Sequence, residues 1–139
     1  MYDFVPCGAT NRCPVNRLLA GRYILIVEDE PLIAFQIASA LQEAGAEVTI
    51  TGTLEHALLI AKQDDLSAAI IDHVLRDGHS AILCKTLAER GIPFVMHSGL
   101  TAIDAPECHS APHIPKPANP ARIVSTLVTL LDGAEGRPR

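Results

Sequence analysis

The stretch ILIVEDEP, residues 24–31, places four apolar residues directly before three acids and a proline. An apolar run rich in β-branched residues is typical of a parallel strand that is covered on both faces. Pro31 suits the first turn of a helix. Glu28, Asp29 and Glu30 therefore lie where a buried strand ends. Neighbouring carboxylates at such a point repel one another, so they need either water or a cation.

The alternation of an apolar strand with a helix continues along the chain. Strands are predicted at 23–27, 46–51, 68–71, 92–97 and, for a few residues only, around 113–114. Helices are predicted from Pro31 to a glycine cap at Gly45, over 53–62 with Thr53 as N-cap, over 80–90, and from Asn119 as N-cap. Strands that alternate with single helices through short turns predict an α/β sandwich with a parallel sheet. Because Pro112 and Pro115 cannot donate to a ladder, we expect the last strand at a sheet edge.

Composition limits the class of protein. The chain has 139 residues, 48% of them hydrophobic and 19% charged, which is ordinary for a soluble globular domain. A formal net charge of -5 argues against nucleic acid as the main partner, and no apolar run is long enough to span a membrane. We expect a loose N-terminal extension over 1–21, one folded domain over 22–131, and a tail over 132–139. The cysteines lack metal-site spacing and are interpreted as free thiols in a reducing cytoplasm.

Polar side chains follow the predicted strands at their carboxyl ends. Glu28 and Asp29 follow the first strand, Asp72 the third, Ser98 the fourth and Lys116 the fifth. In a doubly wound sheet these ends meet at one crevice, where functional groups gather. Three acids, a hydroxyl and an ammonium would converge there. Carboxylate oxygens with water are the ligands that Mg²⁺ prefers, so the acids predict a hard divalent cation.

Four segments together resemble the receiver domain of bacterial two-component response regulators. These segments are ILIVEDEP, AAIIDHVLRDG, PFVMHSG and the IPKP around Lys116, in the family's order and at about its spacing. The resemblance covers roughly 22–131. It implies a flavodoxin-like doubly wound sheet of five parallel strands in the order 2-1-3-4-5, with helices on both faces. The prolines between 100 and 117 make the family's fourth helix short or irregular in this chain, with at most one turn near 101–105.

The resemblance also implies a role for each site residue. Asp72 would be the phosphoacceptor, and Lys116 and Ser98 would contact the phosphoryl group. Four groups would be ligands of Mg²⁺ or Mn²⁺: Glu28, Asp29, Asp72 and the backbone carbonyl of Val74. His113 stands where the family usually has the aromatic residue of its conformational switch, so this coupling is expected to be altered, or His113 is simply satisfied by nearby backbone.

The function that the resemblance implies is signalling, not enzymatic turnover. A sensor histidine kinase or a histidine phosphotransfer protein would supply the phosphoryl group, and an unknown downstream protein would bind the product, with no nucleic acid or membrane partner. Only eight residues follow Leu131, so we expect a stand-alone receiver that is a monomer or a weak dimer.

Two other readings stay open at this stage. In the first, the chain is a pseudo-receiver, an interaction module that works without phosphorylation, which His113 and the broken fourth helix favour. In the second, it is a small flavodoxin-like enzyme or nucleotide binder. That class needs a glycine-rich phosphate loop after the first strand, where this chain has EDEPL.

Overall fold

A single parallel sheet forms the centre of the molecule. The computed structural model describes residues 17–72, 74–75, 78–99 and 111–135. The sheet has five strands in the order β2-β1-β3-β6-β7, which confirms the predicted topology. Its strands are β1 (Tyr23–Val27), β2 (Glu47–Thr51), β3 (Ala68–Ile71), β6 (Phe94–Ser98) and β7 (His113–Pro115). As predicted, the proline-flanked strand β7 lies at an edge of the sheet.

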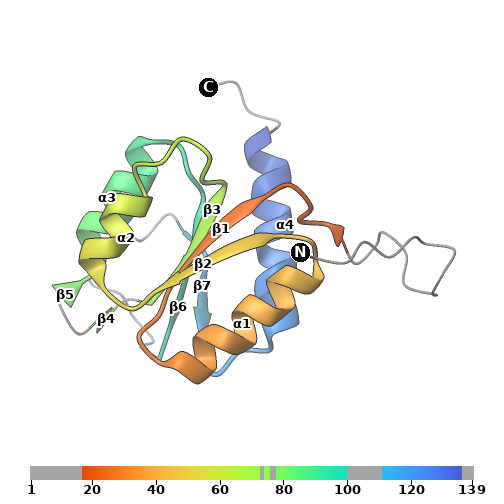
Figure 1. The fold of residues 1–139 in the computed structure, drawn as a ribbon, viewed down its shortest axis with the longest axis horizontal. Helices are drawn as coiled ribbons and strands as arrows, with labels where there is room; N and C mark the ends of the chain where they lie inside the picture. The colour runs from red at the N-terminus through yellow and green to blue at the C-terminus, as the bar shows by residue number, and fades with distance from the viewer. Residues whose placement is uncertain (1–16, 73, 76–77, 100–110, 136–139) are drawn as a thin grey trace, which may run out of the picture.

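Helices of the described residues cover both faces of the sheet (Figure 1). The helices are α1 (Pro31–Glu43), α2 (Leu54–Ile60), α3 (Ala81–Glu89) and α4 (Pro120–Glu135). Alternate residues of the strands point to opposite faces, so the core is divided into two apolar layers. One layer joins α1 and α4 to side chains such as Ile26, Ile70 and Val95. The other joins α2 and α3 to side chains such as Val27 and Ile71.

The predicted helix caps are present. Thr53 Oγ1 accepts a hydrogen bond of 3.3 Å from His56 N, and Asn119 Oδ1 accepts one of 2.9 Å from Ala121 N. Gly45 follows α1 with a φ of 99°, a conformation that a side chain would strain. The capping residues of the sequence therefore set where these three helices begin or end.

Element boundaries differ from the predictions by one or two residues, for local reasons. The strand predicted over 92–97 runs instead from Phe94 to Ser98. Ile92 N donates to Leu87 O at 2.9 Å and so closes α3, which removes Ile92 from the sheet. The helix predicted over 53–62 ends earlier, at Ile60, and Ala61 is its C-cap.

A short antiparallel hairpin follows β3 and was not predicted. It pairs β4 (Val74–Leu75) with β5 (Gly78–His79). Two residues a strand are too few to show the alternation by which strands are identified in a sequence. The predicted helical turn near 101–105, and with it the irregular fourth helix of the family, lies outside the described residues.

Regular backbone structure extends beyond residues 22–131 at both ends. Leu19 is 1% exposed and belongs to the core layer of α1 and α4, and its backbone N donates to Ala44 O at 2.8 Å. Within residues 17–21, Leu19 is therefore packed against the domain. At the other end, α4 continues to Glu135, past the predicted boundary at Leu131. In the part of the chain described here, no helix is both long and apolar enough to cross a membrane.

Candidate functional site

Backbone hydrogen bonds hold two acidic residues at the carboxyl edge of the sheet. Glu28 follows β1, and its N–H donates to Thr51 O of β2 at 2.9 Å. Asp72 follows β3, and its N–H donates to Val27 O of β1 at 2.9 Å. These bonds continue the sheet ladder by one residue. Glu28 and Asp72 are therefore fixed side by side, and both are buried.

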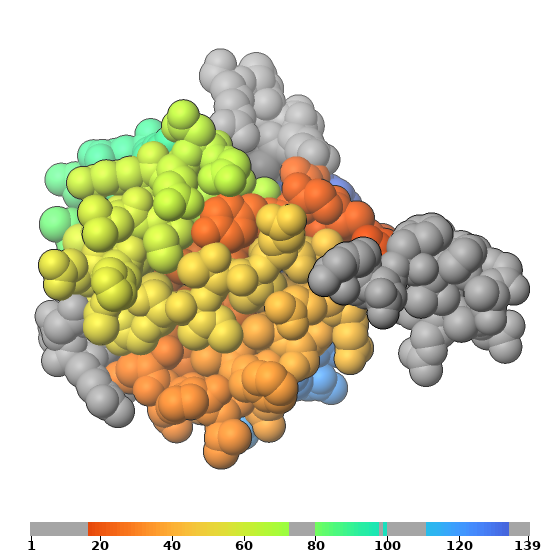
Figure 2. All heavy atoms as spheres, viewed as in Figure 1, coloured from red at the N-terminus to blue at the C-terminus, as the bar shows by residue number. Residues whose placement is uncertain are grey.

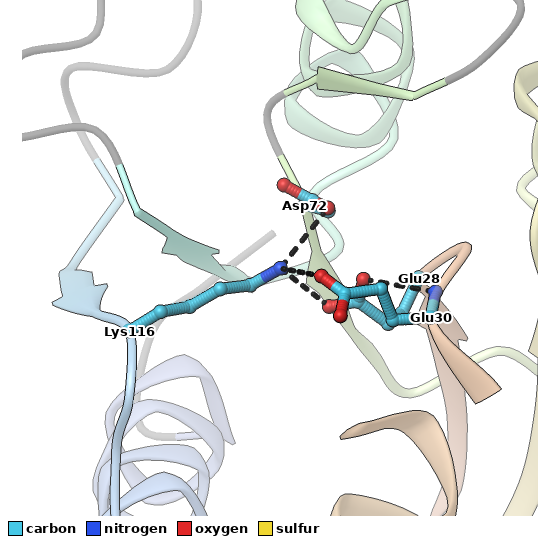
Figure 3. Close-up of polar contacts among 4 residues, drawn as sticks. All are labelled: Glu28, Glu30, Asp72 and Lys116. Atoms are coloured by element: carbon cyan, nitrogen blue, oxygen red, sulfur yellow. Dashed lines mark hydrogen bonds and ion pairs between the residues drawn. The ribbon is translucent and has the colours of Figure 1, made fainter. Parts of the chain in front are cut away.

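Lys116 directly follows the edge strand β7 and supplies a positive charge at the site. Its Nζ lies 2.9 Å from Glu28 Oε1 and 3.2 Å from Asp72 Oδ2, and 4.0 Å from Glu30 Oε1 (Figure 3). The Lys116 side chain is 16% exposed and that of Glu28 only 2%, so both charges are largely removed from water. Charge-assisted hydrogen bonds in such surroundings are strong and short.

Burial and the neighbouring charges together shift the pKa values of Glu28 and Lys116. Burial raises the pKa of Glu28, and the negative charge of Asp72 raises it further, whereas the hydrogen bond from Lys116 opposes this change. Burial alone would lower the pKa of Lys116. The hydrogen bond to Glu28 and the attraction of Asp72 and Glu28 outweigh burial, so the pKa of Lys116 is raised and the lysine stays positive.

Three carboxylates form a group that could hold a metal ion. Oxygen atoms of Glu28, Asp29 and Asp72 all lie within 4.8 Å of one another. Within the described residues, no imidazole or thiolate joins this group. A set of carboxylate oxygens suits Mg²⁺ or Mn²⁺ rather than zinc or copper. The residues present therefore fit the hard divalent cation expected from the sequence.

The sequence of residues 24–128 matches the family model of the response regulator receiver domain. The chain belongs to this family. The match includes every residue of the acidic group and Lys116. Receiver domains are signalling domains of two-component systems, and the family interacts with histidine kinases or phosphotransfer proteins.

Solved structures of receiver domains have the same fold. A CheY-like receiver domain protein from Methanospirillum hungatei JF-1 is 26% identical, with a TM-score of 0.75 over 82% of this chain and 96% of that chain. A response regulator receiver protein from Sinorhizobium medicae WSM419 is 21% identical, with a TM-score of 0.73 over 82% and 97%. The receiver domain of the sensor histidine kinase PA1611 from Pseudomonas aeruginosa PAO1, solved with magnesium coordinated in its active site cleft, is 22% identical, with a TM-score of 0.70 over 81% and 99%. No curated protein matched the sequence.

Of the other predicted site residues, Ser98 and Val74 lie near this carboxyl edge, whereas His113 lies at the start of β7. Ser98 is the last residue of β6, and Val74 begins the short strand β4, two residues after Asp72. The Ser98 side chain and the Val74 side chain lie outside what the structure describes. His113 begins β7; its Nε2 is buried and finds no hydrogen-bond partner among the described residues. Within the described residues, Nε2 of His113 therefore does not make the backbone hydrogen bond that was one of the two expectations for this residue.

Two residues near the site were missed by sequence reasoning. Glu30 belongs to the acidic stretch but was not assigned to the site, although its carboxylate approaches Lys116. His97 lies on β6, and since Ile71 pairs with Met96, it is the cross-strand neighbour of Asp72. The sequence feature that could have identified His97 is a polar residue in an otherwise apolar strand, within the segment PFVMHSG. Its position beside Asp72 depends on the register between β3 and β6, which the sequence does not state.

Replacing His97 by leucine is expected to stabilise the protein. His97 is 3% exposed, and neither ring nitrogen has a hydrogen-bond partner in the described structure. Unsatisfied polar groups of this kind cost about 1–3 kcal/mol each, so His97→Leu should raise the free energy of unfolding at pH 7 by about 1–3 kcal/mol. Urea unfolding followed by circular dichroism measures this difference.

The effect of His97 should depend on pH. Burial first, and then the charge of Lys116, lowers the pKa of His97 below its ordinary value of 6.5. The unfolded state thus binds this proton more readily, and stability is lost as the pH falls below about 6.5 toward the lowered pKa. The advantage of His97→Leu should therefore grow on acidification. The exposed His56→Gln variant is the control, and an advantage that stays constant between pH 7 and 5 would contradict the assignment.

Proposed function

We propose that this receiver accepts a phosphoryl group on Asp72 from a histidine kinase or a histidine phosphotransfer protein. The observation that carries the proposal is the contact of Lys116 Nζ with Asp72 Oδ2 at 3.2 Å, beside a group of acids able to hold a cation. A structural ion pair would need only one carboxylate. The clustering of Glu28, Asp29 and Asp72, two of which share one ammonium, is costly unless the site binds a further cation.

The chemistry assigned to Asp72 is nucleophilic attack by a carboxylate oxygen on phosphorus. Both reactants are negative, so the reaction needs positive charge at the site. Lys116 already contacts the carboxylate of Asp72. In the proposal, its ammonium then contacts the oxygens of the phosphoryl group after transfer and stabilises their negative charge. Ser98, at the end of β6, would donate its hydroxyl to the same group. His113 is proposed to replace the usual aromatic switch residue on β7.

A divalent ion is the remaining source of positive charge. Glu28, Asp29, Asp72 and the backbone carbonyl of Val74 are the groups proposed to hold Mg²⁺ or Mn²⁺. Such an ion, when bound, neutralises phosphoryl oxygens and helps to orient them. The magnesium ion in the active site cleft of the PA1611 receiver domain supports this assignment for a relative of the same fold.

A protein donor is supported by the surface of α1 near the site. This helix begins directly after Glu30, and two of its large apolar side chains, Leu32 and Phe35, are 78% and 67% exposed. The helix, orange in Figure 2, lies openly on the molecular surface. An apolar surface beside the phosphoacceptor suits a protein donor better than a small molecule. After transfer, the receiver is proposed to signal by binding a downstream protein.

Intact-protein mass after incubation with Mg²⁺ and acetyl phosphate tests the proposal. The wild type should gain the mass of one phosphoryl group, and chelation of the metal should abolish the gain. Asp72→Asn should gain nothing, because an amide is not a nucleophile for this reaction. Asp65→Asn changes an exposed aspartate that precedes the amino end of β3, the end opposite Asp72; it is the matched control and should behave as the wild type.

A contrary result would favour a different function. If the wild type gains no mass with any divalent ion, and beryllofluoride also fails to bind, phosphorylation of Asp72 is wrong. The chain would then act as a phosphorylation-independent interaction module.

A further inference from the structure

Glu30 stands at the opening of the site, between the buried acids and solvent. Its side chain is 64% exposed, and its Oε1 lies 4.0 Å from Lys116 Nζ (Figure 3). Its backbone N–H donates to Glu28 Oε2 at 3.3 Å, a contact that does not involve the Glu30 side chain. Glu30 is also the N-cap of α1 but makes no side-chain capping hydrogen bond. The carboxylate can therefore be changed without removing a cap or the contact to Glu28.

The carboxylate of Glu30 decides the net charge that a phosphoryl donor meets. By formal charge, the site holds four carboxylates and one ammonium: Glu28, Asp29, Glu30 and Asp72 with Lys116. A bound divalent ion leaves one negative charge uncompensated. Without Glu30 the site would be neutral. Because Glu30 is the most exposed of the group that contacts Lys116, its charge acts first on an approaching molecule.

We propose that Glu30 is a specificity-determining residue that disfavours phosphoryl donors of high net negative charge. The site then favours donors in which a cationic leaving group partly offsets the phosphoryl charge, such as a phosphorylated, protonated imidazole. This inference rests on the proposed phosphorylation of Asp72 and adds which class of donor the site prefers. Exposed charges act through water, so the discrimination is modest and depends on salt.

Two small donors of different charge isolate this effect. Acetyl phosphate is a dianion at neutral pH, whereas phosphoramidate carries a protonated amine and is a monoanion. In both cases an Asp72 oxygen forms the new bond to phosphorus. The P–O bond of acetyl phosphate breaks and acetate leaves with the electron pair. The P–N bond of phosphoramidate breaks and ammonia leaves, since its nitrogen is already protonated.

The experiment compares the rate constants of phosphorylation with each donor, measured by intact mass, in the wild type and two variants. Glu30→Gln should raise the rate with acetyl phosphate about two- to fivefold at low ionic strength, as expected for one charge several ångströms away in water. The rate with phosphoramidate should rise less, so the ratio of the two rates changes. Both effects should shrink at high salt. Glu43→Gln makes the same charge change at the exposed far end of α1 and should leave the ratio unchanged.

The outcomes separate this inference from the proposed function. If the wild type is labelled by both donors but Glu30→Gln leaves their ratio unchanged, the specificity role is wrong and phosphorylation of Asp72 stands. Equal slowing with both donors would also overturn it, because a merely structural role predicts that result. If neither donor labels the wild type, the proposed function fails first and the inference fails with it.

Discussion

Replacing Lys116 by methionine is expected to lower the free energy of unfolding of the metal-free protein by about 2–3 kcal/mol. Loss of one partner from a buried ion pair costs about 3–5 kcal/mol. Because the Lys116 side chain is 16% exposed, water screens its charge in part, and we expect a smaller loss of stability. Methionine keeps most of the length of the side chain, so the loss reports mainly on the charge. Urea unfolding in the presence of a chelator measures it.

The stability lost in Lys116→Met should be restored in part by Mg²⁺. Without the ammonium, the carboxylates of Glu28 and Asp72 lose the positive charge of Lys116 and bind a divalent ion more tightly. A ligand that binds only the folded state stabilises it according to its concentration and affinity. The gain from Mg²⁺ should therefore be larger in the variant than in the wild type.

The control for this prediction is Lys85→Met, on an exposed position of α3. It should change stability by less than about 0.5 kcal/mol and leave the response to Mg²⁺ as in the wild type. A Lys116→Met protein that is as stable as the wild type, with no larger gain from Mg²⁺, would contradict the electrostatic account of the site.

Leu127→Ala is expected to destabilise the protein by about 3 kcal/mol. Leu127 is fully buried in the layer where α4 meets α1 and the sheet. Leucine-to-alanine changes in such positions cost about 2–5 kcal/mol, since they remove apolar contact and leave a cavity. Denaturant unfolding measures the loss as a lower midpoint with an unchanged slope.

The matched control is Leu59→Ala on α2, where the leucine is 60% exposed. This variant should stay within about 0.5 kcal/mol of the wild type. A loss below about 1 kcal/mol for Leu127→Ala would mean that α4 contributes little to the core of this layer. Since Leu127 lies away from the acidic group, the phosphorylation of Asp72 should persist wherever the variant is folded.

Much of the fold could be predicted because its signals are local. The run before Glu28 has the composition of a doubly covered strand, and Thr53 and Asn119 cap helices by contacts with residues only a few positions away. Where the signals were too short, the prediction failed. The hairpin of β4 and β5 has two residues a strand, and Leu19 belongs to an apolar run of only three residues, 18–20, of which it alone is buried.

The membership of the acidic group could also be predicted, because parallel strands bring their carboxyl ends to one edge. That rule is enough to join Glu28, Asp29 and Asp72, which the structure places within 4.8 Å. It is not enough to say which side chains touch. The Glu28–Lys116 contact at 2.9 Å depends on how far each side chain reaches across β1, β3, β6 and β7.

By itself, the sequence determined the alternation of strands and helices and the edge at which the acids meet, since both follow from the hydrophobic pattern along the chain. The strand order was implied by the resemblance to receiver domains. Only the tertiary structure decided the environment of each group at that edge. Strand register places His97, whose ring has no hydrogen-bond partner among the described residues, beside Asp72. The turn into α1 brings Glu30 within 4.0 Å of Lys116. Burial and distance set the charge interactions of these groups, and both arise only when segments far apart in the chain pack together.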